Sequence, residues 1–311
     1  MASLPPSETT AWRAVVRVLR SPLDAIGCAA FPSNCRICNF PLLQISSSPV
    51  CADCWSDLPE QSKNQLCTIC GEHLGWGDLR LRGNETQSIC AMCERVRPAF
   101  EQAVAYGVYE GTLRALIHLL KYEHVAPVAD ALGELLAGAV MNLRDLPDAI
   151  TVVPVPLHAS KQRERSFNQT VLLAEAAVRA LRHDRPTMQI EFAAHAMERL
   201  RSTPSQSGLT PRQRRMNLRG VFSVREPKRV AGQTVLLIDD IYTTGATARE
   251  CTRTLLQAGA AAVYVATLAR SQREGVAMWD SFVPKHAIPA RPADPISSSS
   301  AELSGGTYAT C

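Results

Sequence analysis

The sequence predicts an α/β protein in which a parallel β-sheet is flanked by helices and is preceded by a small metal-binding region. Two observations lead to this prediction. Four consecutive apolar residues, 235–238, are followed by a polar turn and then by apolar residues at helical spacing, the pattern of a strand buried on both faces and a helix. Eight of the eleven cysteines form four CxxC pairs, a spacing typical of zinc sites.

The composition changes along the chain, which at 311 residues is longer than one ordinary domain. We expect an N-terminal helix or leader over 1–30, a double zinc ribbon over 31–97, the α/β domain over 98–275 and a disordered tail over 276–311. The prediction of a tail rests on its prolines and its run of serines.

Charge and hydropathy exclude some classes of protein. Hydrophobic residues make up 46% of the chain, as in folded proteins, and a net charge of +4 is too small to indicate nucleic-acid binding by itself. No stretch approaches the ~20 apolar residues that cross a membrane. Because Arg13, Arg17 and Arg20 interrupt the first apolar segment, it lacks the core of a signal peptide. We therefore expect a cytoplasmic protein.

The cysteine pairs predict one or two structural zinc sites. A CxxC pair places two thiolates on one side of a metal ion, so four pairs can supply two tetrahedral Cys₄ sites. The surrounding region is short and polar, and zinc would supply much of its folding free energy. The simplest arrangement joins successive pairs, and an interleaved cross-brace is the alternative. The predicted ligands are Cys35, Cys38, Cys51, Cys54, Cys67, Cys70, Cys90 and Cys93.

Beyond the cysteines, the apolar pattern predicts alternating strands and helices. Prolines end one of the strands because they cannot continue a ladder of hydrogen bonds. The expected elements, in chain order, are a strand over 104–109, a helix over 111–122, a helix beginning near Pro127, a strand over 150–156, a basic run over 161–169, a helix that includes 171–181, a strand over 235–238, a helix over 248–258 and a strand over 262–269.

The turn after residues 235–238 favours a phosphate ligand. Unpaired N–H groups and the helix dipole make a helix N-terminus an anion site. Small residues let the backbone approach the ligand closely, and hydroxyl groups supply further donors. The turn residues are Thr243, Thr244, Gly245, Ala246 and Thr247.

Two adjacent carboxylates, Asp239 and Asp240, precede this turn. A phosphate alone would not favour carboxylates beside it, whereas sugar hydroxyls or a metal ion would. A ligand that carries a phosphate next to a diol is a ribose 5-phosphate. An ordinary turn between a strand and a helix is the alternative interpretation.

Two basic regions are candidates for binding a second anion. Leu157 and His158 follow a strand and lead to Arg165 near a helix start, where pyrophosphate would be stabilised, although a solvated basic loop is the alternative. Residues 199–219 contain six arginines and no acidic residue. Such a segment could close over a polyphosphate or bind a nucleic-acid backbone.

With these motifs in this order, the chain resembles the ComF family, whose members join a double zinc ribbon to a type I phosphoribosyltransferase domain. The resemblance covers residues 32–269. Ser166 departs from the family pattern, which usually has glycine there. Besides the cysteine pairs, the resemblance rests on residues 119–122, 153–158 and 165–169, a spaced set between Arg201 and Phe222, and residues 238–245.

The resemblance implies a type I phosphoribosyltransferase-like fold that binds 5-phosphoribosyl 1-pyrophosphate (PRPP) with Mg²⁺. Asp239 and Asp240 would hold the ribose hydroxyls, and Arg201 and Arg212 would stabilise the leaving pyrophosphate.

The resemblance further implies a role in natural transformation and in uptake or processing of single-stranded DNA, with a competence helicase or a recombination protein as partner. One alternative is a non-catalytic accessory protein that uses the PRPP fold to bind a ligand or nucleic acid. Another is a nucleotide-salvage or amidophosphoribosyl enzyme.

Overall fold

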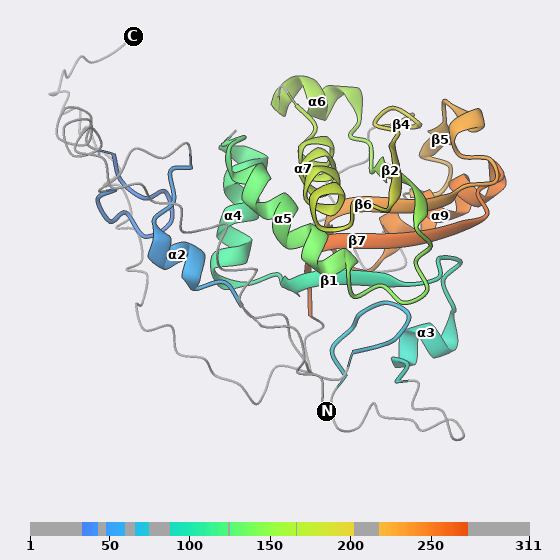
Figure 1. Cartoon of the computed structure of the whole chain (residues 1–311), viewed down its shortest axis with the longest axis horizontal. Coiled ribbons are helices and arrows are strands. Elements are labelled where there is room, and N and C mark those ends of the chain that lie inside the picture. The colour runs from blue at the N-terminus through green and yellow to red at the C-terminus, as the bar shows by residue number, and fades with distance from the viewer. Residues whose placement is uncertain are drawn as a thin grey trace, which may run out of the picture. The chain divides into compact units, whose positions relative to one another are not determined.

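A computed structural model describes residues 33–42, 48–59, 66–74, 88–123, 125–165, 167–201 and 218–272 (Figure 1). The predicted helix over 1–30, the predicted tail over 276–311, Ser166 and Arg212 lie outside the described residues. Among the helices of the described segments, none is long and apolar enough to span a membrane.

A five-stranded parallel sheet forms the centre of the α/β domain, with the strand order β1-β7-β6-β2-β3. The central strands are rich in Val, Leu and Ala and are buried along most of their length, as expected for strands covered on both faces. The predicted α/β class is therefore confirmed. The strands are β1 (Ala103–Val108), β2 (Ala149–Pro154), β3 (Gln189–Phe192), β6 (Thr234–Tyr242) and β7 (Ala262–Arg270).

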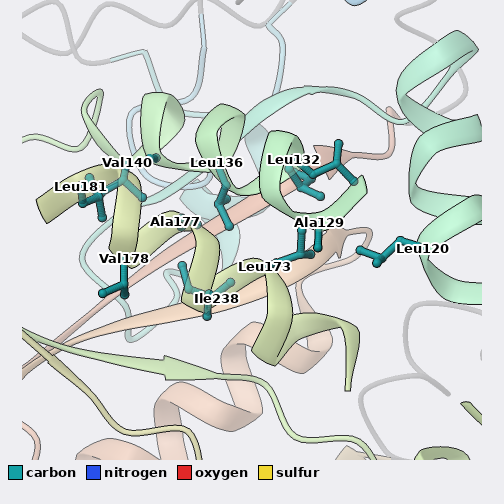
Figure 2. Packing of buried hydrophobic residues seen from close by; sticks show 14 of the residues in the cluster. Leu120, Ala129, Leu132, Leu136, Val140, Leu173, Ala177, Val178, Leu181 and Ile238 are labelled. Atoms are coloured by element: carbon teal, nitrogen blue, oxygen red, sulfur yellow. The ribbon is translucent and has the colours of Figure 1, made fainter. Parts of the chain in front are cut away.

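Three helices cover one face of this sheet: α4 (Gly111–Tyr122), α5 (Val128–Val140) and α7 (Gln169–Asp184). Their apolar residues recur every three or four positions, so each helix presents one apolar side to the sheet. Helices α5 and α7 pack against each other, and Figure 2 shows their side chains converging with Ile238 of β6. Each buried leucine contributes about 1.5–3 kcal/mol, which makes this layer a main source of stability.

The other face carries α9 (Ala246–Gln257) and an antiparallel hairpin formed by β4 (Met197–Arg199) and β5 (Phe222–Val224). The hairpin was not predicted, because three-residue strands are too short for their alternation to be recognised. The short elements are α2 (Ala52–Ser56), α3 (Ala91–Arg95), α6 (Ala159–Arg165), which occupies part of the predicted basic run, and a 3₁₀ turn, η1 (Pro227–Arg229).

Close packing between α5 and α7 depends on Gly133. A methyl group added there would lie 2.2 Å from Cβ of Ala176 and 2.9 Å from backbone atoms of α7. Backbone atoms cannot move aside as a flexible side chain can, so the helices would separate. We expect Gly133→Ala to lower the free energy of unfolding by about 1–3 kcal/mol, measured from the urea midpoint.

The matched control is Gly138→Ala, the same change on the exposed side of the same helix. Because alanine is the better helix former, this variant should be more stable by about 0.5–1 kcal/mol. Equal losses of stability in the two variants would contradict the packing argument.

Candidate functional site

The two aspartates lie within β6, because the strand continues to Tyr242 instead of ending at residue 238 as predicted. Successive side chains of a strand point to opposite faces of the sheet. Asp240 accordingly contacts α4 and α7, whereas Asp239 lines a pocket beside α9. One strand thus places the two carboxylates in different environments.

The pocket lies where β6 passes into α9, at the carboxyl edge of the sheet. It brings together most of the predicted motif, although Asp240 and Thr244 do not line it. Thr267 of the neighbouring strand β7 contributes to its wall and was not predicted. The lining residues are Asp239, Ile241, Tyr242, Thr243, Gly245, Ala246, Thr247, Ala248 and Thr267.

Gly245 allows the turn to approach the strand closely. Its φ is +72°, and a Cβ atom there would lie 2.1 Å from the phenol oxygen of Tyr242, so only glycine fits. The first N–H groups of α9 lie at the end of this turn, and N–H groups in that position attract anions. The Thr244 hydroxyl is buried with no hydrogen-bond partner in the described part of the chain, and it lies outside the residues that line the pocket.

Asp239 holds its proton unusually tightly. Burial, followed by the charge of Asp240, raises the pKa of Asp239 to about 7. Its carboxylate also accepts a hydrogen bond from the backbone N–H of Asp240 at 2.9 Å. Near neutral pH the carboxyl group is therefore divided between its protonated and charged forms, and a ligand that favours the charge would draw it toward that form.

Asp240 is buried, and each of its carboxylate oxygens has a partner. Oδ1 accepts from Nζ of Lys121 at 2.8 Å, and Oδ2 accepts from Nε2 of Gln169 at 2.8 Å. Burial lowers the pKa of Lys121, but the charge of Asp240, the hydrogen bond to it and the charge of Asp239 together outweigh burial, and the net shift is upward. The ion pair therefore joins β6 to α4 and α7, an arrangement that the sequence analysis did not anticipate.

Arg199 of β4 provides a cation for which no separate role was predicted. Burial lowers its pKa, and the charge of Asp239 acts in the opposite direction. Its guanidinium lies over the ring of Phe222, 5.6 Å from the centroid. Arg201, which was predicted to bind pyrophosphate, is exposed and donates to the carbonyl oxygen of Arg219 at 2.9 Å. Among the arginines of this segment that the structure describes, Arg199 is thus the one whose charge acts on Asp239.

The residues predicted to hold a second anion follow β2. Leu157 and His158 are half-buried, and Nδ1 of His158 lies 2.8 Å from Oγ of Ser160. Because β2 is parallel to β6 and adjacent to it, both residues lie at the same edge of the sheet as the pocket. Arg165 is the last residue of α6.

The eight predicted cysteine ligands form two groups, and successive pairs share a group. The first cysteine group comprises Cys35, Cys38, Cys51 and Cys54, and the second comprises Cys67, Cys70, Cys90 and Cys93. The simpler predicted pairing is therefore the one adopted, and the interleaved alternative is wrong. Within each group the sulfur atoms lie within 4.8 Å of one another.

The sulfur positions fit zinc. A tetrahedral site with Zn–S bonds of about 2.3 Å requires sulfur atoms about 3.8 Å apart. The Cys35–Cys54, Cys38–Cys51 and Cys70–Cys90 sulfur pairs are separated by 3.8, 3.5 and 3.6 Å. The N–H groups of Cys54 and Cys93 donate to the sulfurs of the cysteines that cap α2 and α3, which would stabilise thiolates.

The chain is similar in sequence to one protein family and to several known proteins. Residues 168–287 match the phosphoribosyl transferase domain family. The chain is 31% identical over 245 residues to the DNA utilization protein YhgH of Escherichia coli K12, with 77% of this chain and 98% of that protein covered. It is also 31% identical over 231 residues to competence protein F of Haemophilus influenzae (71% and 96% covered) and 28% identical over 230 residues to competence protein ComFC of Bacillus subtilis (71% and 84%).

The two cysteine groups predict independent metal sites. We expect the purified chain to hold one zinc ion in each group, and Cys38→Ser and Cys70→Ser each to retain the ion of the other group. Elemental analysis beside a protein assay measures the ratio. A variant that lost both ions would show that the sites fold together, and a metal-free wild type would contradict the assignment.

The raised pKa of Asp239 predicts a pH-dependent stability. The folded-state pKa is about 7 and the reference value is 3.8, so the folded state binds the proton more tightly and stability falls as pH rises between these values. Asp239→Asn removes this penalty. We expect the variant to gain thermal stability over wild type, and to gain more at about pH 8 than at about pH 6.

Asp184→Asn removes a carboxylate at the exposed end of α7 and serves as the control for this measurement. Its difference from wild type should show no comparable rise between the two pH values. An Asp239→Asn variant with the same small difference at both pH values would contradict the raised pKa.

Proposed function

The chain belongs to the ComF family of competence proteins, which includes competence protein F and the DNA utilization protein YhgH, and from this premise we propose that it binds PRPP with Mg²⁺. We further propose that binding supports natural transformation, through the uptake or processing of single-stranded DNA. One observation carries the ligand assignment: a carboxylate, a glycine turn and the start of a helix line a single pocket.

The pocket provides for both ends of a ribose 5-phosphate. The turn from Thr243 to Thr247 and the first N–H groups of α9 would bind the 5-phosphate, because a helix N-terminus stabilises negative charge. Asp239 would accept hydrogen bonds from the ribose hydroxyls in its charged form. Ligand binding should therefore favour loss of the Asp239 proton and strengthen as pH rises through about 7.

Asp240 has a supporting role in this proposal. Its oxygens are directed to Lys121 and Gln169, so it fixes the end of β6 and with it the position of Asp239. The carboxylate of Asp239 also suits Mg²⁺, which prefers oxygen ligands and substrate phosphates. Bound there, the ion would neutralise part of the charge on the pyrophosphate.

Turnover would require transfer of the phosphoribosyl group to an acceptor. The bond between C1 of ribose and pyrophosphate would break, with positive charge developing on the ring and negative charge on the leaving group. Asp239 would face the first charge, and Arg199, whose charge acts on Asp239, is a candidate to offset the second. Arg201 and Arg212, both in the cationic segment of residues 199–219, remain candidates for the same role.

The second candidate function is nucleic-acid binding without turnover. The observation that favours it is the position of Arg201 and Arg219, two exposed arginines joined by a hydrogen bond at the base of the cationic segment. Exposed arginines bind phosphate backbones with an affinity that falls as salt rises. A helicase or recombination protein of the transformation pathway is the proposed protein partner.

Calorimetric titration with PRPP and Mg²⁺ tests the ligand assignment. We expect wild type to bind and Asp239→Asn to bind about 10- to 100-fold more weakly, because a hydrogen bond to a charged group is lost. Asp240 is unsuitable as the first variant, since its removal would leave Lys121 buried without its counterion and perturb the fold.

Asp184→Asn is again the matched control and should bind like wild type. Gly245→Ala tests the turn independently, because the added methyl group would collide with Tyr242. Failure of the wild type to bind would overturn the PRPP assignment. Salt-sensitive binding of single-stranded DNA, lost in an Arg201→Ala/Arg219→Ala variant, would then favour the second function.

A further inference from the structure

Arg270, the last residue of β7, is a charged side chain that is only 4% exposed. Its Nη1 donates to the carbonyl oxygen of Cys70 at 2.6 Å. Its Nη2 donates to Oε2 of Glu72 at 2.6 Å and lies 3.5 Å from the sulfur of Cys70. One guanidinium therefore holds the turn that carries two members of the second cysteine group. The proposed ligand site uses none of these contacts.

The same guanidinium lies over the ring of Tyr242, 4.3 Å from its centroid. Tyr242 and Arg270 are paired in register on β6 and β7, so the sheet itself fixes this contact. The ring is buried edge-on against Phe100, and its phenol oxygen lies against Gly245 of the proposed phosphate-binding turn, residues 243–247. Arg270 thus contacts the turn that carries Cys70 on one side. On the other side it contacts Tyr242, whose ring packs against the phosphate-binding turn.

The first cysteine group is attached differently. It packs through apolar side chains against α4, and Asp57 of the same region accepts a hydrogen bond from Thr112 at 2.7 Å. The Arg36–Glu123 pair of this region is exposed on both sides. None of these side chains is among the residues that line the pocket.

We propose that Arg270 is a positioning residue that couples the second cysteine group to the phosphate-binding turn. A donor to a metal-bound sulfur orients that ligand, and changes at such donors typically cost 10- to 100-fold in metal affinity. When the metal leaves, the turn around Cys70 loses the binding energy that folds it. Arg270 then loses its partners, a buried charge without partners is unstable, and its movement removes the support from Tyr242.

Hydrogen exchange of residues 243–248 tests the coupling in the full-length chain. Cys38→Ser and Cys70→Ser are a matched pair, because each changes the second cysteine of the first CxxC pair in its group. We expect Cys70→Ser to speed exchange of these amides about tenfold or more and Cys38→Ser to leave it unchanged. Slow exchange of residues 235–238 in both variants shows that the sheet is intact.

Variants outside the cysteine groups test the path through Arg270. Arg270→Lys keeps the charge but loses the planar guanidinium that contacts Cys70 and Glu72 together. Zinc release from the second cysteine group to a chelator should therefore quicken about tenfold, and the amides of the phosphate-binding turn should exchange faster. Tyr242→Leu should speed exchange of the turn without altering zinc release. Tyr242→Phe, which keeps the ring, should restore slow exchange.

The coupling would be overturned if Cys70→Ser and Cys38→Ser affected the turn equally, or if Arg270→Lys left both zinc release and exchange unchanged. Its consequence for affinity rests on the proposed function, and Arg270→Lys should weaken PRPP binding. The exchange measurement needs no ligand. Failure of wild type to bind PRPP would therefore count against the proposed function alone.

Discussion

The ion pair between Asp240 and Lys121 constrains the arrangement of the whole site. Removing two charges from water costs free energy. Their attraction offsets this desolvation only where the geometry is good and the remaining hydrogen bonds are made. Here Lys121 and Gln169 satisfy both carboxylate oxygens. Lys121 lies near the end of α4, so a shift of this helix along the sheet would leave a buried charge unpaired. Gln169 lies at the start of α7, so a shift of α7 would leave one oxygen of the Asp240 carboxylate without its donor.

This constraint explains how neighbouring aspartates acquire different properties. The strand directs Asp240 to its counterion and Asp239 to the pocket, and the negative charge of Asp240 is one reason that Asp239 holds its proton. Lys121 and Arg199 lower the pKa of Asp239, but burial and Asp240 outweigh them. The result is a carboxyl group poised near neutral pH, a property common at functional sites.

Local patterns predicted the elements that bury many residues. The helix over 111–122 was predicted at its observed bounds because four apolar residues recur on one side, and all four are fully buried. By contrast, the predicted strand ends before the acidic pair, because carboxylates rarely occur inside a buried strand. The partners that make this possible, Lys121 and Gln169, are 119 and 71 residues away in sequence, and no local pattern shows such a contact. The cysteine ligands were predictable because their spacing is itself local.

The two cysteine groups differ in how deeply they are built into the α/β domain. In the second group all four cysteines are buried, whereas Cys38 of the first group is exposed. The pair formed by Arg270 and Glu72 is shielded from solvent, so its attraction is weakened far less by water and salt than that of the exposed Arg36–Glu123 pair. Loss of the second metal would thus disturb charges within the core, while loss of the first would disturb mainly an apolar contact. Two chemically identical sites can therefore have unequal influence on a pocket that neither of them touches.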